Sequence, residues 1–148
     1  MVSTKRQLYY EDVQDGMEVP SLVKRPTHVQ LFLFSAVKHN PHRIHYDQAY
    51  ARSEGHPDVL VTGTIHGAFL TQMLTDWIGD KGFLKKLSYS NRGKAIPGDV
   101  LTCEGRVTKR YESEGRCYVE SEIWERNQRD EVLCRGSALV VLPKRAHD

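Results

Sequence analysis

The sequence lacks a long apolar run. Its 148 residues contain no stretch close to the roughly 20 consecutive apolar residues that a transmembrane helix needs. The first residues, Met1 to Glu11, carry charges and have no apolar segment of the kind a secretory signal requires. These two absences lead us to expect a cytoplasmic protein that does not bind a membrane.

Cysteine is scarce, and its spacing matches no metal site. The three cysteines, at positions 103, 117 and 134, each lie in a stretch where apolar and polar residues alternate. We therefore expect small buried thiols in a reducing compartment. The pattern His42-x-x-His45-x-Asp47 contains metal-ligand residue types, but no further ligand set accompanies it. The prediction is that the protein binds no metal.

An excess of one charge sign is also missing. The 21 Lys and Arg residues nearly balance the 19 Asp and Glu residues, and the basic residues are scattered, so a nucleic-acid partner is not expected. The hydrophobic fraction of 39% and the charged fraction of 27% are ordinary for a globular domain. The chain has no repeat, linker or low-complexity tract. We expect one domain over residues 1–148.

The first half of the chain has helical periodicity. A helix is predicted over about 27–38, with Thr27 as its N-cap and an almost wholly apolar interior that implies burial on more than one side. A longer helix is predicted over about 64–79 and ends at Gly79. Its apolar residues form one broad stripe: Ile65, Phe69, Leu70, Met73, Leu74, Trp77 and Ile78.

The second half of the chain alternates between apolar and polar residues, as strands do. Four strands are predicted, over about 84–95, 99–111, 116–126 and 131–142, and a weaker one within 8–23. Short polar turns between the four strands favour an antiparallel meander. The pattern predicts an α+β domain in which a long helix packs on a curved antiparallel sheet of about five strands.

The segment Asn40-Pro41-His42-Arg43-Ile44-His45-Tyr46-Asp47 concentrates the side chains that can do chemistry. Histidine titrates near neutrality, so His45 suits proton transfer, although a structural histidine is an equally good interpretation. Asn40 precedes it by five residues, and both could face one pocket. Asp47 suits the N-cap of a short following helix better than a catalytic acid. His42 and Arg43 are candidates for contact with a substrate or a neighbouring subunit.

The turn Leu60-Val61-Thr62-Gly63 leads into the long helix. Gly63 offers a backbone N–H at a helix N-terminus, where the helix dipole favours developing negative charge. A tight strand-to-helix turn would explain the same glycine. His66 lies one turn further on, where we expect a packed histidine with its hydrogen bonds satisfied.

Together these motifs resemble the MaoC-like hydratases and dehydratases of the hot-dog fold. Enoyl-CoA hydratases of that type carry Asp-x-Asn-Pro-x-His-x-Asp and then a Val-His-Gly turn. His45 and Asp47 match the last two residues of the first motif, and Val61-Thr62-Gly63 matches the turn with threonine in place of histidine. Asn40 stands where the family has its catalytic aspartate. The run Arg-Ile-His-Tyr-Asp is similar to the Htd2-type and mesaconyl-CoA-hydratase-type branch, and the resemblance extends from about Tyr9 to Pro143.

The resemblance implies a single hot-dog domain that adds water to a trans-2-enoyl thioester, or catalyses the reverse dehydration. It implies that His45 acts as the base and acid and that the Gly63 N–H donates a hydrogen bond to the thioester carbonyl. The amide of Asn40 can orient water but cannot titrate. His42, Arg43, Thr62 and Asp47 are then expected near the substrate.

No permanently bound cofactor is expected, because coenzyme A (CoA) or acyl carrier protein would bring the acyl group. The basic residues that follow the long helix are candidates for its phosphates: Lys85, Lys86, Arg92 and Lys94. A solvated strand face would explain them equally well. We also expect a homodimer, or a heteromer with another MaoC-like chain.

Two other functions fit the same sequence. Asn40 in place of aspartate is what a non-catalytic subunit of a heteromeric hydratase would show, with the chain shaping the acyl pocket of its partner. A hot-dog thioesterase usually needs an acid near the thioester, and the acid inside the long helix, Asp76, lies near the end remote from Gly63.

Overall fold

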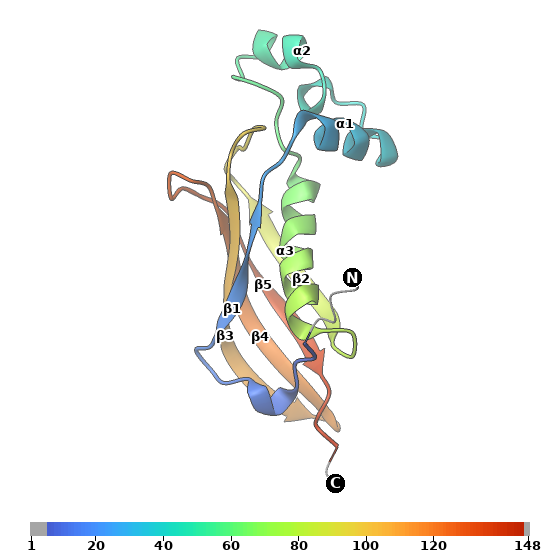
Figure 1. Ribbon diagram of the computed structural model, residues 1–148, viewed down its shortest axis with the longest axis vertical. Helices are drawn as coiled ribbons and strands as arrows, with labels where there is room; N and C mark the ends of the chain where they lie inside the picture. The colour runs from blue at the N-terminus through green and yellow to red at the C-terminus, as the bar shows by residue number, and fades with distance from the viewer. Residues whose placement is uncertain (1–5, 147–148) are drawn as a thin grey trace.

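A long helix lies along a curved antiparallel sheet of five strands (Figure 1). The computed structural model describes residues 6–146. The strand order is β1-β3-β4-β5-β2. The strands are β1 (Glu18–Lys24), β2 (Phe83–Asn91), β3 (Leu101–Ser113), β4 (Arg116–Arg126) and β5 (Val132–Leu142). The α+β prediction is confirmed, and the arrangement is that of a hot-dog domain.

The sheet topology differs from the predicted four-strand meander. Strands β3, β4 and β5 are consecutive neighbours, but β2 pairs with β5 at one edge of the sheet and not with β3. The other edge of β3 is taken by β1, with Leu22 opposite Cys103. Residues 92–100 therefore cross from β2, at one edge of the sheet, to β3, which is second from the other edge. The Ile96–Asp99 turn lies within this crossover and does not form a hairpin.

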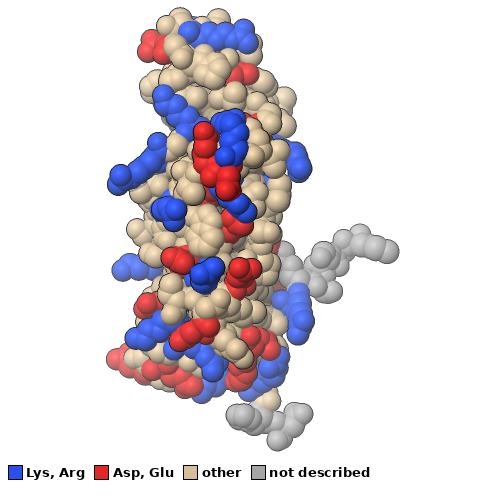
Figure 2. Space-filling model, turned by 90° about the vertical axis from the view of Figure 1, so that its left-hand side faces the viewer, with Lys and Arg blue, Asp and Glu red and all other residues tan. Residues whose placement is uncertain are grey.

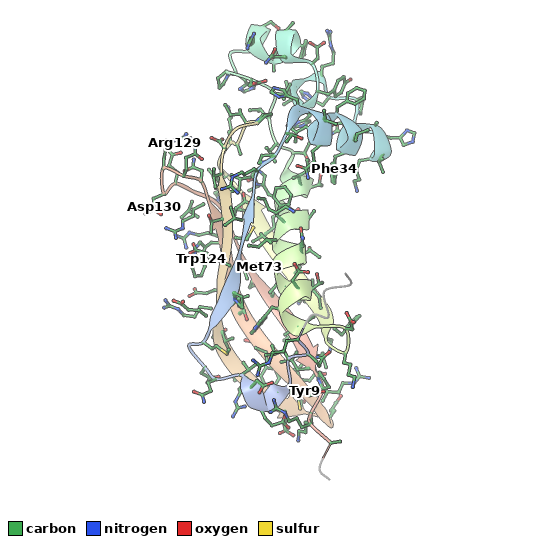
Figure 3. The ribbon with its side chains drawn as sticks, viewed as in Figure 1. Tyr9, Phe34, Met73, Trp124, Arg129 and Asp130 are labelled. Carbon is green, nitrogen blue, oxygen red and sulfur yellow. The ribbon has the colours of Figure 1, made fainter. Side chains whose placement is uncertain are left out.

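The central helix α3 (Gly63–Ile78) begins and ends as its sequence predicts. The Thr62 hydroxyl accepts a hydrogen bond from the Ile65 N–H at 3.2 Å, and Gly79 follows the last turn with a φ of 74°. The apolar stripe is buried against the concave face of the sheet, and Met73 lies between the helix and the strands (Figure 3). This burial provides the main core and fixes where the first turn of α3 lies.

Two short helices and a connecting turn gather beyond one end of the sheet (Figure 1). They are α1 (His28–Val37), η2 (Arg43–His45) and α2 (Gln48–Ser53); a further turn, η1 (Tyr10–Asp12), precedes β1. The expectation that α1 is buried on several sides is wrong for this chain alone. Its buried residues are Leu31 and Ser35, while Val29, Phe32, Leu33 and Val37 are exposed. Phe34 points toward the core and is half-buried (Figure 3).

The surface carries charges of both signs side by side. On the face shown in Figure 2, Lys and Arg alternate with Asp and Glu over the length of the molecule. The three cysteines are free and buried, as the alternating pattern predicts. Within residues 6–146, no helix combines the length and apolar character that crossing a membrane requires.

Candidate active site

His45 lies at the end of η2 with one ring nitrogen already engaged. Its Nδ1 lies 2.8 Å from the Leu60 carbonyl oxygen, so Nδ1 carries the proton and donates. In the neutral ring this leaves a lone pair on Nε2. Burial of the ring lowers the pKa of His45 below its ordinary value of 6.5, with the Leu60 carbonyl acting in the opposite direction and the adjacent His42 adding to the decrease. A neutral imidazole with Nε2 free to accept a proton is the form that a general base requires.

The segment whose Leu60 carbonyl accepts the hydrogen bond from His45 also leads into α3. The Leu60 N–H donates to the Ile44 carbonyl at 2.9 Å, and the Val61 N–H donates to Ala95 at 2.8 Å. The backbone from Leu60 to Val61 is thereby tied to η2 on one side and to the crossover loop on the other. Because Gly63 lies two residues after Val61, His45 and the N-terminus of α3 are parts of one hydrogen-bonded unit.

Gly63 occupies the first position of α3, where a backbone N–H has no acceptor inside the helix. In the described part of the chain, no other acceptor for this N–H is found. The Tyr89 hydroxyl donates to the carbonyl of Gly63 at 3.2 Å. A side chain at Gly63 would meet the Asn91 amide at 3.7 Å, an ordinary contact. The helix start thus presents an unused donor beside the end of β2.

Asn40 is used to shape the loop. Its side-chain oxygen accepts a hydrogen bond from the His42 N–H at 3.1 Å, and its own N–H donates to Ser35 at 2.9 Å. The residue lines a cavity of about 310 Å³ together with Phe32 and Tyr46. The centroid of the His42 ring lies 5.7 Å from that of the His45 ring.

Asp47 and Arg43 form a local pair. The Asp47 carboxylate accepts from the Tyr50 N–H at 3.0 Å and so caps α2, as the sequence predicts. It also lies 2.6 Å from the Arg43 guanidinium. The Tyr50 backbone N–H and then Arg43 lower the pKa of Asp47, which keeps the carboxylate ionised. Both its oxygens are thus committed within the loop.

Thr62 is committed in a similar way. Its hydroxyl caps α3, lies 3.0 Å from the Thr64 hydroxyl, and is buried. Substrate contact through the Thr62 side chain stays a prediction.

The four predicted phosphate contacts do not lie together. Lys85 packs its ammonium over the ring of Tyr118, on the strand segment remote from Gly63. Lys86, five residues before Asn91, is about 17 Å along β2 from the helix start. Arg92 and Lys94 come within three residues of Asn91, the end of β2 that lies beside Gly63. Their contact with a cofactor stays a prediction.

Asp76 lies at the other end of α3. It lines a cavity of about 500 Å³ with Leu22, Met73 and Trp77. Thirteen residues of helix separate it from Gly63, which is about 20 Å. The geometry leaves this acid remote from the donor at the helix start.

The structure also brings together a pair that the sequence reasoning missed. His66 is buried as expected, but its Nδ1 hydrogen-bonds to the carboxylate of Glu125 on β4, and no described residue partners its Nε2. The signal was an acid at an inward position of an alternating strand. No group of three or more metal-ligating side chains was found among residues 6–146.

Comparison with known proteins gives a consistent result. Residues 5–97 match the family described as hydroxyacyl-thioester dehydratase type 2. No match was found among curated protein sequences.

Among solved structures, the chain is similar to the R-hydratase PhaJ1 of Pseudomonas aeruginosa, with 20% identity, a TM-score of 0.85, and coverage of 94% of this chain and 88% of that one. It is similar to a MaoC-like dehydratase of Rhodospirillum rubrum, with 24% identity, a TM-score of 0.80, and coverage of 95% and 99%. The ChsH1-ChsH2 complex of Mycobacterium tuberculosis matches at 16% identity and a TM-score of 0.77, over 87% of this chain and 98% of that one.

The structural neighbours share the fold, and the family match spans well over half of the sequence. It includes the loop that carries His45 and the turn that carries Gly63. The chain therefore has the hot-dog fold and belongs to the hydroxyacyl-thioester dehydratase type 2 family.

Proposed function

We propose that the protein hydrates a trans-2-enoyl thioester, or dehydrates the 3-hydroxyacyl thioester in the reverse direction. The observation that carries this proposal is the tautomer of His45. Its Nδ1 donates to Leu60, so a neutral ring presents a proton-accepting Nε2 and is held by the segment that leads into α3. Family membership supports the same class of reaction.

In the hydration direction, His45 Nε2 takes a proton from water while the water oxygen bonds to C3 of the enoyl group. The electron pair of the C2–C3 double bond moves toward the thioester, and negative charge develops on the carbonyl oxygen. The Gly63 N–H, supported by the α3 dipole, stabilises that charge. The imidazolium of His45 then returns its proton to C2. Dehydration reverses each step.

Asn40 favours a second candidate, a non-catalytic subunit of a heteromeric hydratase. Its amide oxygen is engaged by the His42 N–H, and an amide does not supply the charge of a carboxylate. The exposed apolar side chains of α1 are a further argument for a partner chain. One structural neighbour is itself described as a complex of two chains.

We further propose that CoA or acyl carrier protein delivers the acyl group, with no permanently bound cofactor. Arg92 and Lys94 support this, because they follow the strand end that contacts Gly63. A homodimer or a heteromer with another MaoC-like chain is the proposed assembly, and the cytoplasm is the proposed location. The three free cysteines support a reducing compartment.

The test is turnover of purified protein with trans-2-enoyl-CoA substrates of short, medium and bulky acyl groups. Loss of the enoyl absorbance without release of free thiol is the expected result. Thiol release from a saturated acyl-CoA would instead support a thioesterase. Absence of turnover by the chain alone, with activity gained in Asn40→Asp or on addition of a second MaoC-like chain, would favour the subunit role.

A further inference from the structure

The first turn of α3 contains a buried polar residue in an otherwise apolar face. His66 and Glu125 both have side chains with 0% exposure, and the His66 Nδ1–H donates to the Glu125 carboxylate. The neighbouring inward residues of the helix, such as Ile65, Phe69 and Leu70, are apolar. The pair joins the first turn of the helix directly to the middle strand of the sheet.

Glu125 is held in place from its own side of the sheet. In the pairing of β3, β4 and β5, it lies between Cys103 and Cys134. The Cys103 thiol donates to the second carboxylate oxygen at 3.6 Å. Burial, and then the nearby Glu125 charge, raises the pKa of Cys103, so the thiol keeps the proton that it donates. Each oxygen of the carboxylate therefore has a donor, and the acceptor offered to His66 is fixed in direction.

A second polar contact joins the same turn to β2. The Tyr89 hydroxyl donates to the Gly63 carbonyl at 3.2 Å. It reaches this carbonyl because Gly67 has no side chain, since a Cβ at that position would overlap the Tyr89 hydroxyl and ring. Burial raises the pKa of Tyr89, which keeps the hydroxyl protonated.

These contacts are poorly explained as sources of stability. A buried ionisable pair contributes little compared with well-packed apolar side chains of the same volume. In addition, no described residue partners His66 Nε2, which adds the cost of an unsatisfied polar atom. A hydrogen bond fixes the direction between two groups, and an apolar contact does not. An oxyanion donor must be held to within about 0.5 Å of its working position.

We propose that His66, Glu125 and Tyr89 are positioning residues, which hold the Gly63 N–H where the thioester carbonyl of the substrate binds. The inference rests on the proposed hydratase function and deepens it. None of the three residues is assigned contact with the substrate. They act by fixing the first turn of α3 against β4 and β2.

The test measures kcat and KM for hydration of trans-2-enoyl-CoA in three folded variants. Tyr89→Phe removes one contact, and the double variant His66→Leu/Glu125→Leu replaces the other with an apolar pair. Tyr89→Phe and the double variant are each expected to lower kcat by about 10- to 100-fold, as small misplacement of a reacting group does. Both are expected to leave KM nearly unchanged. Glu125→Gln keeps an oxygen that accepts from His66 Nδ1–H and is expected to retain kcat. Tyr111→Phe, on the ring stacked with Tyr118, is the matched control for loss of a phenol hydroxyl.

Different results separate this proposal from the function it rests on. If the wild type shows no hydration of any enoyl-CoA, with or without a second MaoC-like chain, the proposed function is wrong and the positioning proposal falls with it. If the wild type is active, and Tyr89→Phe and the double variant melt at lower temperature but keep kcat within about twofold, the residues are merely structural. The positioning proposal alone is then overturned. Should the double variant fail to fold, Tyr89→Phe decides the question by the same criterion, with Glu125→Gln as its conservative control.

Discussion

At the scale of single residues, the proposed chemistry depends on the protonation state of His45. A ring that donates through Nδ1 to a backbone carbonyl can act as a base only while Nε2 has no proton. Because burial lowers the pKa of His45 below its ordinary 6.5, the neutral ring predominates at neutral pH.

The expected pH profile follows from that direction. As pH falls through the lowered pKa of His45, the ring gains a proton and kcat/KM for hydration decreases; the midpoint is expected below 6.5. Steady-state rates from acid to neutral pH measure it, with stability checked at each pH. A midpoint above 6.5 would contradict the assigned environment of the ring.

Asp47 provides a prediction about stability. Asp47→Ala removes the cap of α2 and the partner of Arg43, and is expected to lower the free energy of unfolding because the Tyr50 N–H loses its acceptor. Asp47→Asn keeps an N-cap acceptor and is expected to cost less. Urea unfolding of the two variants measures the difference. Equal losses would mean that the charge, and not the cap, is what matters.

Several residue-level features were readable from sequence alone. Thr27, Asp47 and Gly79 were predicted as helix caps because capping depends on a few neighbouring residues, and all three are confirmed. The partner of His66 was not predictable, because Glu125 lies 59 residues away and meets it only through the fold. The use of Asn40 by the His42 N–H likewise depends on loop geometry.

At the scale of elements, two glycines of α3 have different requirements. Gly67→Ala would force a Cβ into the Tyr89 ring, and we expect a loss of about 1–3 kcal/mol in unfolding free energy. Gly63→Ala meets Asn91 at an ordinary contact distance, so its stability is expected to stay near that of the wild type. Chemical denaturation of the two variants is the measurement. A Gly67→Ala variant as stable as the wild type would rule out the close approach of Tyr89.

The elements were predictable where local periodicity determines them, and their pairing was not. The stripe of α3 and the alternation of β3 to β5 gave the correct types and nearly the correct bounds. β1 occupies the edge of β3, and β2 pairs with β5 instead. No local pattern in the sequence reveals this pairing. For α1, an apolar sequence indicated burial, but a single chain leaves Val37 79% exposed.

At the scale of the whole molecule, the exposed face of α1 predicts assembly. Phe32 and Val37 lie on a helix that stands beyond the end of the sheet (Figure 1). We expect sedimentation of the wild type to give at least twice the 17.0 kDa of one chain. The double variant Phe32→Asp/Val37→Asp is expected to shift the protein toward monomer, because it introduces charge into the contact.

A matched control replaces an exposed residue elsewhere. Glu114 lies at the tip of the hairpin between β3 and β4, and Glu114→Lys is expected to leave the sedimentation mass unchanged. A wild type that sediments as a monomer would show that the apolar face has another explanation.

The proposed function depends on His45 as the base of an enoyl thioester hydratase. The direct measurement is the hydration rate of wild type, His45→Ala and His42→Ala on the enoyl-CoA that the wild type turns over best. We predict a loss of about 10²- to 10⁴-fold for His45→Ala and a much smaller loss for its neighbour. Equal rates in His45→Ala and the wild type would contradict the account.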